Sequence, residues 1–314
     1  MRAFLLPLLA LFFGIGLRDA AAGPSRKVAA PQKHSALAAE ISAKGFKAKR
    51  LGAHTLLIRE GDFGYVLDTG TPGLMRLELP FSTDALKGKA HDDFIGFLAA
   101  LNRERRWVSL SYQPKGKRTT LRIDQAVESD AQLLELLPKA LRFLETIAPD
   151  LPFPPVRRAV YRHDGDAAPG ISAAVPAAAA APPLGGLERM KRLLDAEGIR
   201  TSVDKDGDLS FVVTGVHYFV AVDKDASDFL RVAAQYSYDG DPLQQRAACN
   251  KVNALVVLSK CTPIDAQTTM FNAEQYLPAS SHGAAQFRAA MVALARAHDA
   301  FNEALAATST KSAR

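Results

Sequence analysis

Alternating aspartates in one short segment are the chain's nearest approach to a metal-binding motif. Asp204, Asp206 and Asp208 are spaced like the acids at positions 1, 3 and 5 of an EF-hand calcium loop. That loop also needs glycine at position 6 and glutamate at position 12, where this chain has Leu209 and Gly215. Because both diagnostic positions fail, the segment predicts a tight turn that leads into a strand.

Histidines and nucleophiles form no other chemical constellation. His163, Asp164 and Asp166 look like a metal cluster, but they lie at the start of a Pro/Ala-rich segment that would not hold ligands in place. His298 falls on the apolar stripe of an expected helix, where a lone histidine is expected to pack. The sequence contains no nucleophile elbow, phosphate loop or zinc-protease motif. We therefore predict no catalytic residue, no metal site and no cofactor.

The two cysteines, Cys249 and Cys261, raise the question of a disulfide. Export from the cytoplasm would allow one. The expected fold argues against it, since Cys249 falls about one turn before the end of a helix and Cys261 about seven residues along the following strand. That placement predicts sulfurs more than about 10 Å apart, whereas a disulfide needs Cα atoms within roughly 7 Å.

The elements that carry these residues are repeated along the chain. A shift of 153 positions (218 − 65) places Tyr65 on Tyr218 and Gly45 on Gly198. Further matches, the last two at a slightly smaller shift, are Leu56 with Leu209, Leu77 with Leu230, Leu79 with Val232, Asn102 with Asn250, and residues 108–111 with 256–259. The matched positions are apolar, turn-forming or small and polar, so the chain is predicted to hold two copies of one fold.

Periodicity predicts the same element order in both copies. In the first copy the expected helices are 35–44, 91–103 and one that ends near residue 147, and the strands are 55–59, 63–67, 75–79, 107–112 and 119–123. In the second copy the helices are 187–197, 242–252 and a long closing helix, and the strands are 208–214, 217–222, 228–236, 254–260 and 268–272. Pro138 is expected to kink or divide its helix, and Asn250 and Asn253 to close theirs. This order predicts an α+β fold, with each copy an antiparallel sheet packed by helices.

Composition changes mark the expected domain boundaries. The copies occupy residues 34–150 and 187–307, joined by a Pro/Ala-rich linker at 151–186; residues 23–33 form a disordered lead and 308–314 a tail. Residues 1–22 have a basic start, an apolar run and small residues, which predicts a signal peptide cleaved after Ala22, with a retained anchor as the alternative. We expect a periplasmic or secreted protein with no transmembrane segment in the mature chain.

Several segments of the second copy carry residues of a known family. They are Gly198-Ile199, the acidic turn 204–208, residues 219–222 and 228–231, and Asn250 with Asn253. On these, residues 187–305 resemble the bacterial YbjN family of sensory-transduction regulators, whose fold is similar to type III secretion chaperones. The first copy resembles the family more weakly, with residues 51–54 in place of the acidic turn and Arg105 at the position of Asn253. The resemblance implies regulation and protein binding and supplies no catalytic residues.

Charge is unevenly divided between the copies. The chain has a net charge of +6, and residues 23–150 alone hold 20 Lys/Arg against 15 Asp/Glu, or +5. Two groups form a candidate basic interaction patch: Lys44, Lys47, Lys49 and Arg50, and Lys115, Lys117 and Arg118. Such groups suit an acidic partner or an anionic membrane surface, with a solvated face as the alternative. Export makes nucleic acid an unexpected partner.

These observations favour a non-enzymatic exported protein that binds or regulates another, unidentified protein through two YbjN-like domains. One alternative is an enzyme with an unrecognised site at the domain junction, which a deep pocket lined by convergent polar side chains would favour. Another is an envelope adaptor that binds anionic partners through the basic first domain. Because secretion chaperones of this fold commonly dimerise and the linker makes association intramolecular, we expect a monomer whose copies form a pseudo-twofold pair. Two independent domains on a flexible linker are the alternative.

Overall fold

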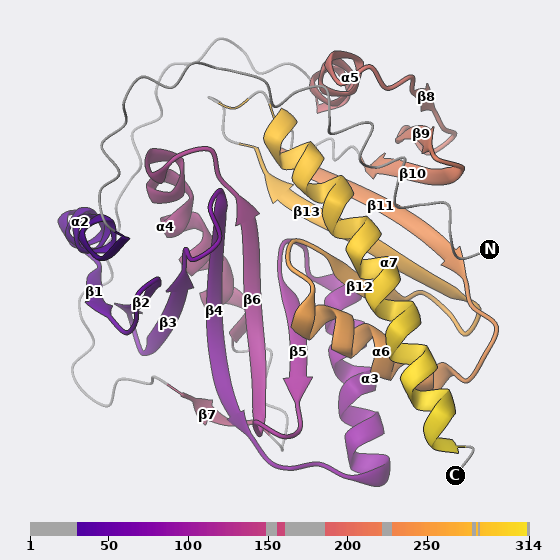
Figure 1. Cartoon of the computed structure of the whole chain (residues 1–314), viewed down its shortest axis with the longest axis horizontal. Helices are drawn as coiled ribbons and strands as arrows, with labels where there is room; N and C mark the ends of the chain where they lie inside the picture. Colours follow the sequence, from indigo (N-terminus) through magenta and orange to yellow (C-terminus); the bar gives the residue numbers. More distant parts are fainter. Residues whose placement is uncertain are drawn as a thin grey trace.

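The computed structural model describes residues 30–148, 156–160, 186–221, 228–277, 281 and 283–312, and these residues form two similar halves (Figure 1). The elements of the first half are α2 (Ala30–Ala43), β1 (Lys47–Arg50), β2 (Thr55–Glu60), β3 (Phe63–Asp68), β4 (Leu74–Thr83), α3 (Gly88–Glu104), β5 (Ser109–Gln113), β6 (Arg118–Ala126), α4 (Asp130–Ile147) and β7 (Val156–Ala159). Those of the second half are α5 (Gly186–Ala196), β8 (Ser202–Val203), β9 (Leu209–Val213), β10 (Val216–Ala221), β11 (Phe229–Ser237), α6 (Pro242–Leu255), β12 (Lys260–Pro263), β13 (Thr268–Tyr276) and α7 (Ala284–Ser312).

Each half contains one antiparallel sheet with the same strand order. The first sheet runs β1-β2-β3-β4-β6-β5, and β7 adds to β4; the second runs β8-β9-β10-β11-β13-β12. All neighbouring strands pair antiparallel. The prediction of an α+β fold made of two similar copies is confirmed. Among the described helices, none combines the length and hydropathy that a bilayer crossing requires.

Alternation along the strands builds a separate hydrophobic core in each half. In the first, Leu56 and Ile58 of β2 and Leu67 of β3 belong to one core with the buried leucines of α4. In the second, the corresponding side chains pack beneath α7, where Phe287 and Leu294 are buried. Each fully buried side chain of this size contributes about 1.5–3 kcal/mol of transfer free energy. The period-2 and period-3.6 patterns of the sequence therefore produce the observed layers.

Strand pairing corrects the alignment of the two copies at β4 and β11. Leu67 opposes Leu77 in the first sheet, and Val220 opposes Val232 in the second. Since Leu67 and Val220 are equivalent at the shift of 153, the residue equivalent to Leu77 is Val232 and not Leu230. The second copy therefore has two additional residues before β11, and the shift of 153 positions does not hold there.

Hydrogen bonding also corrects the match of Asn102 with Asn250. The Asn102 amide bonds to both backbone groups of Leu110, with Leu110 N–H donating at 2.7 Å and Asn102 Nδ2 donating to the carbonyl at 2.8 Å. Asn253 makes the same pair with Cys261, at 2.7 and 3.0 Å. Asn102 is therefore equivalent to Asn253, three residues away from the position that the sequence suggested.

Several predicted element boundaries differ from the structure. The predicted strand at 254–260 is wrong, because α6 continues to Leu255 and β12 begins only at Lys260. Strands β1, β7 and β8 were not predicted. The helix α4 is not divided at Pro138. Helical structure begins at Ala30 within the predicted disordered lead, and α7 extends through the predicted tail to Ser312.

Candidate functional site at the junction between the halves

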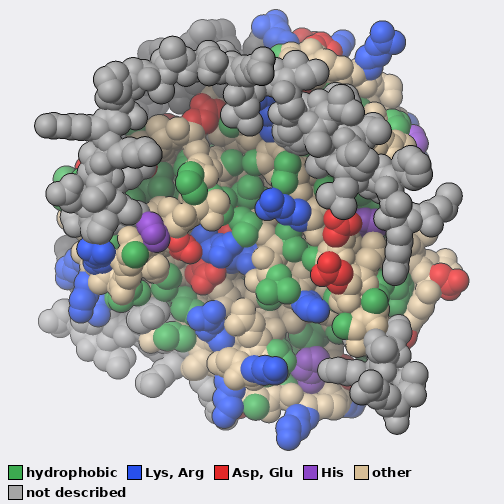
Figure 2. All heavy atoms as spheres, viewed as in Figure 1, with side chains coloured by type: hydrophobic (Ala, Val, Ile, Leu, Met, Phe, Trp, Pro, Cys, Tyr) green, Lys and Arg blue, Asp and Glu red, His purple; other side chains and the backbone are tan. Residues whose placement is uncertain are grey.

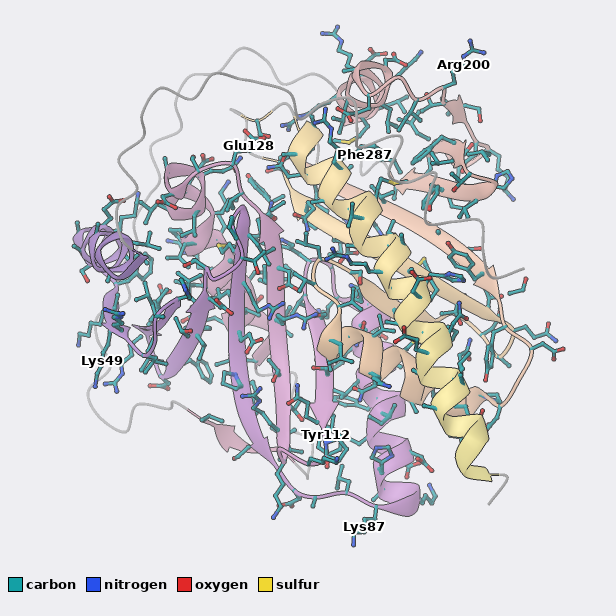
Figure 3. All side chains as sticks on the ribbon, in the orientation of Figure 1. Lys49, Lys87, Tyr112, Glu128, Arg200 and Phe287 are labelled. Carbon is teal, nitrogen blue, oxygen red and sulfur yellow. A yellow bond between two sulfur atoms is a disulfide. The ribbon has the colours of Figure 1, made fainter. Side chains whose placement is uncertain are left out.

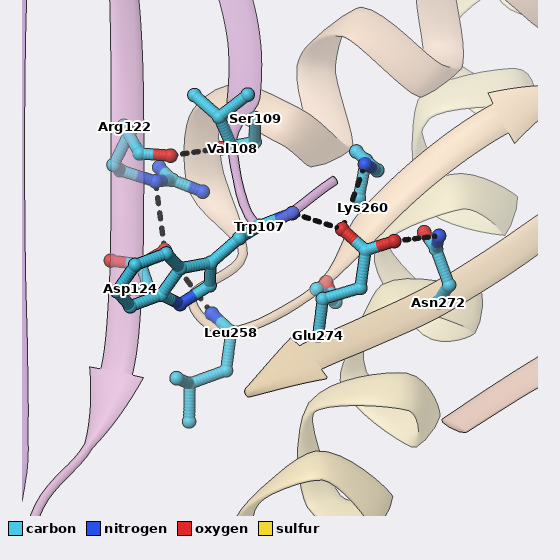
Figure 4. Close-up of a pocket in the computed structure, with 10 residues that line it drawn as sticks. Trp107, Val108, Ser109, Arg122, Asp124, Leu258, Lys260, Asn272 and Glu274 are labelled. Atoms are coloured by element: carbon cyan, nitrogen blue, oxygen red, sulfur yellow. Dashed lines mark hydrogen bonds and ion pairs between the residues drawn. The ribbon is translucent and has the colours of Figure 1, made fainter. Parts of the chain in front are cut away.

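Two carboxylates at the junction hold backbone groups of the opposite half. Asp124 of β6 accepts a hydrogen bond from Leu258 N–H at 3.1 Å, and Glu274 of β13 accepts one from Trp107 N–H at 2.6 Å (Figure 4). Trp107 and Leu258 precede β5 and β12 at equivalent positions, and both have positive φ angles, of 57° and 63°. A left-handed backbone is costly for such residues, so these reciprocal bonds stabilise a conformation that neither half favours by itself.

Two buried glutamines repeat the reciprocal pattern one residue further along each strand. Tyr276 N–H donates to Gln125 Oε1 at 2.9 Å, and Gln125 Nε2 donates to the Tyr276 carbonyl at 3.0 Å. Gln275 in turn accepts from Ala126 N–H at 2.7 Å. The equivalent strands β6 and β13 are thus joined through equivalent side chains, which is the signature of a pseudo-twofold relation between the halves.

Two cations of the junction bind the carbonyls at the helix ends of the opposite half. Arg122 donates to the carbonyls of Ala254 and Val256 at the end of α6, at 3.1 and 2.6 Å. Lys260 donates to the Arg105 carbonyl just after α3 at 2.6 Å. Helix C-termini leave unpaired carbonyls and carry partial negative charge, so both contacts are electrostatically favourable.

The buried charges of the junction are also paired within each half. Arg122 lies 2.8 Å from Asp124, and Lys260 lies 3.0 Å from Glu274. Burial lowers the pKa of Lys260, while Glu274 opposes that shift. Because removal of one partner would leave a buried charge uncompensated, each pair depends strongly on its carboxylate.

An aromatic cluster completes the junction around Trp107, the sole tryptophan of the chain. Its ring lies 5.9 Å from Phe143 of its own half, and 6.4 and 6.0 Å from Phe229 and Tyr276 of the other. Its indole N–H donates to Gln125 Oε1 at 3.1 Å. Trp107 fluorescence is therefore a natural reporter of contact between the halves.

A small cavity lies among these residues. Its volume is about 20 Å³, which is room for about one water molecule and far less than a small-molecule site requires. The side chains that line the cavity converge as they do in an active site. The charged side chains among them, however, are paired with one another. Within the described residues, no group of three or more His, Cys, Asp or Glu side chains is arranged to hold a metal ion.

The predicted separation of the two cysteines is wrong: Cys249 and Cys261, between which the sequence disfavoured a disulfide, are joined, with Cα atoms 4.9 Å apart. The prediction placed seven strand residues between the helix end and Cys261, whereas β12 begins only one residue before Cys261. Asn253, one helical turn after Cys249, binds both backbone groups of Cys261 and draws β12 against α6. Asn250 and Asn253 therefore do not close the helix; each binds a strand.

The predicted basic patch divides into two groups at opposite edges of the first sheet. Lys44, Lys47, Lys49 and Arg50 lie on or just before β1, and Lys115, Lys117 and Arg118 lie at the turn between β5 and β6. Figure 3 shows Lys49 and Tyr112 at these opposite edges. The sheet order separates β1 from β5 by five strand spacings, or roughly 24 Å, well beyond the screening length of about 8–10 Å. The seven residues therefore do not form one patch. Figure 2 shows Lys and Arg side chains at several separate places on this face, among them the left and lower margins.

Other residues named from the sequence have structural partners or lie outside the described part. Asp204 Oδ1 accepts from Asp206 and Asp208 N–H at 2.9 and 3.0 Å, which confirms the predicted turn. His298 stacks on Tyr236 with ring centroids 4.3 Å apart, and burial lowers its pKa, which confirms that it packs. Signal cleavage after Ala22 and the histidine at 163 lie outside the described residues.

A second cluster of titratable side chains lies in the first half. Burial raises the pKa of Glu60 to about 7; Glu145 adds to this rise, while Arg142 opposes it. Burial also raises the pKa of Glu145 and of Tyr65. This cluster lies within the first half, where Glu60 and Glu145 are only partly buried, and it does not contribute to the junction.

Comparison of the chain with protein-family models, with curated proteins and with solved structures finds no match. The junction is therefore the feature of the chain that bears on its function, and its charged residues were not predicted from the sequence. One signal was present: Arg122 and Asp124 alternate with Leu121 and Ile123 in a strand. Alternation of this kind predicts that the charged side chains face solvent. In the structure the second half packs against that face and buries them.

Proposed function

We propose that the chain is a non-enzymatic exported protein that binds another polypeptide, built from two YbjN-like domains fused into a pseudo-dimer. The observation that carries the proposal is the reciprocal pair of contacts from Asp124 to Leu258 and from Glu274 to Trp107. In these contacts the polar side chains that converge at the junction bind the two halves to each other. A fused pair of chaperone-like domains then presents its outer surfaces to a partner.

Two further observations support the proposal. The junction cavity of about 20 Å³ has no room for a substrate, which weighs against an enzyme whose site lies between the domains. The disulfide between Cys249 and Cys261 is typical of a protein that folds in an oxidising compartment, in keeping with export to the periplasm or beyond. The two groups of basic residues lie at opposite edges of the first sheet. Their separation weighs against an envelope adaptor that binds an anionic partner through one continuous basic surface.

Binding must be tested with a defined partner. The mature chain, residues 23–314, serves as bait in periplasmic extract, and each captured protein is then purified and titrated against the bait by calorimetry. We expect one saturable complex with a stoichiometry of one bait to one partner. An Asp124→Ala variant that disturbs the junction should weaken this complex, while the exposed Asp93→Ala variant should bind as the parent does. If purified candidates bind both variants and the parent only in a non-saturating manner, the proposed function is wrong.

A further inference from the structure

The pseudo-twofold relation breaks down at one place in the junction. Strand pairing makes Asn272 the equivalent of Arg122, since Arg122 opposes Ser109 and Asn272 opposes Lys260. The guanidinium of Arg122 is long enough to reach the carbonyls of the other half. The Asn272 side chain is too short to span the same distance, and it lines the cavity (Figure 4).

Two polar atoms of the second half line this cavity without a protein partner. Within the described residues, Ser259 Oγ and Asn272 Oδ1 are both buried and accept or donate no hydrogen bond. Only 4% of Ser259 and 1% of Asn272 is exposed. The amide of Asn272 is oriented by its other end, where Nδ2 donates to Glu274 Oε1 at 3.2 Å. Buried groups of this kind are normally satisfied, by protein or by ordered water.

The chemistry of the lining favours a neutral ligand. Arg122 and Lys260 balance Asp124 and Glu274 in charge, and each cation lies within 3.0 Å of its carboxylate. A cation in the cavity would meet Arg122 and Lys260, and an anion would meet Asp124 and Glu274. Arg76 and Arg231, which do not line the cavity, pair with the same two carboxylates at 3.0 and 3.4 Å. The volume of about 20 Å³ matches one water, and a water that donates to Asn272 and bonds to Ser259 satisfies both atoms.

We propose that the cavity is a binding site for one long-lived water molecule, which Ser259 and Asn272 hold between the two halves. Trp107, Val108 and Ser109 of the first half line it from the opposite side. The water supplies for the shorter Asn272 the polar contact that Arg122, at the equivalent position, makes directly with the carbonyls of the other half. The first half needs no such water, because its residue equivalent to Ser259 is Val108, whose side chain has no polar atom.

Oxygen-17 magnetic relaxation dispersion, which counts long-lived internal waters, tests the proposal on the mature chain. The Ser259→Val variant introduces the residue of the equivalent position, removes the unpaired hydroxyl and fills the cavity. We expect it to lose one long-lived water relative to the parent. The control Ser237→Val makes the same change on an exposed position of β11 and should lose none. An equal count in all three proteins would overturn the proposal.

A crystal structure of the parent decides the case independently of whether the variant folds. The expected result is a single density peak at about 2.6–3.2 Å from both Ser259 Oγ and Asn272 Oδ1. An empty cavity would overturn the proposal. So would an anomalous peak at this position in crystals soaked with bromide, since this would identify an anion site.

Discussion

The side-chain amide of Asn250 hydrogen-bonds to both backbone groups of Tyr112 in the other half, each at 2.9 Å. Tyr112 lies on β5, the edge strand of the first sheet, and its N–H and carbonyl face away from β6. Asn102 satisfies Leu110 on the same edge. Unpaired edges are sites of unwanted strand pairing, so the second half both joins the first and protects its edge.

We predict that Asn250→Ala lowers the free energy of unfolding by about 1–3 kcal/mol, because it leaves two partly buried backbone groups of Tyr112 without a partner. Urea unfolding followed by Trp107 fluorescence measures the change. Lys251→Ala, an exposed neighbour on α6, is the matched control and should change stability by less than about 0.5 kcal/mol. Equal losses in the two variants would show that the amide of Asn250 contributes nothing to the interface.

The disulfide should act as a constraint on the unfolded chain and not as a redox switch. Cys249 and Cys261 are 1% and 0% exposed, so a reductant should reach them only after unfolding. We predict that Cys249→Ala/Cys261→Ala lowers the free energy of unfolding by about 3 kcal/mol. The native parent should resist dithiothreitol, with reduction at the rate of global unfolding. Rapid reduction of the native protein would contradict this prediction.

Stability should fall as the pH rises through the titration of Glu60. Its pKa is raised from 4.5 to about 7 in the folded protein, so between these values the folded state binds more protons than the unfolded state. The free energy of unfolding then decreases with pH in this window. Since Glu60 is only half buried, we expect a decrease of no more than about 1–2 kcal/mol from this residue.

The Glu60→Gln variant tests this pH dependence directly. It removes the titration, so its free energy of unfolding should exceed that of the parent by more at pH 8 than at pH 5. Glu104→Gln, at an exposed position, should leave the pH dependence unchanged. If the parent and Glu60→Gln have parallel pH profiles between pH 5 and 8, the carboxyl group is ionised normally in the folded protein.

The two junction carboxylates should have similar and large effects on stability. We predict that Asp124→Ala and Glu274→Ala each cost about 3–5 kcal/mol, because each leaves a buried cation without its partner. Asp93→Ala breaks an exposed pair with Lys89 and should cost less than about 0.5 kcal/mol. Chemical denaturation compares all three variants. A loss for the junction variants no greater than that of Asp93→Ala would remove the electrostatic basis of the interface.

Local patterns were sufficient to predict the repeated element order. Strands β2, β3, β9 and β10 lie within a residue or two of their predicted bounds, because alternation and a following turn determine them locally. The apolar run from Leu255 to Leu258 predicts a strand. In the structure Leu258 instead has a φ of 63°, held by Asp124 from 134 residues away.

Local sequence patterns contain no information on distant contacts, and for this reason the junction and the disulfide were not predicted. Arg122, Asp124 and Lys260 acquire their roles only from contacts across the halves, which no local period encodes. The separation of Cys249 from Cys261 was estimated from the wrong start of β12. The hydrogen bonds from the Asn253 side chain to the backbone of Cys261 determine that start. They also bring Cys261 close enough to Cys249 for the disulfide.

The reciprocal junction should make the two halves unfold as one unit. Hydrogen–deuterium exchange of residues 23–314 across a urea titration tests this most directly. We predict that the amides of β2–β3 and of β9–β10 lose protection at one urea concentration, together with the change in Trp107 fluorescence. Two separate transitions, one for each half, with Trp107 following only the first half, would contradict the claim.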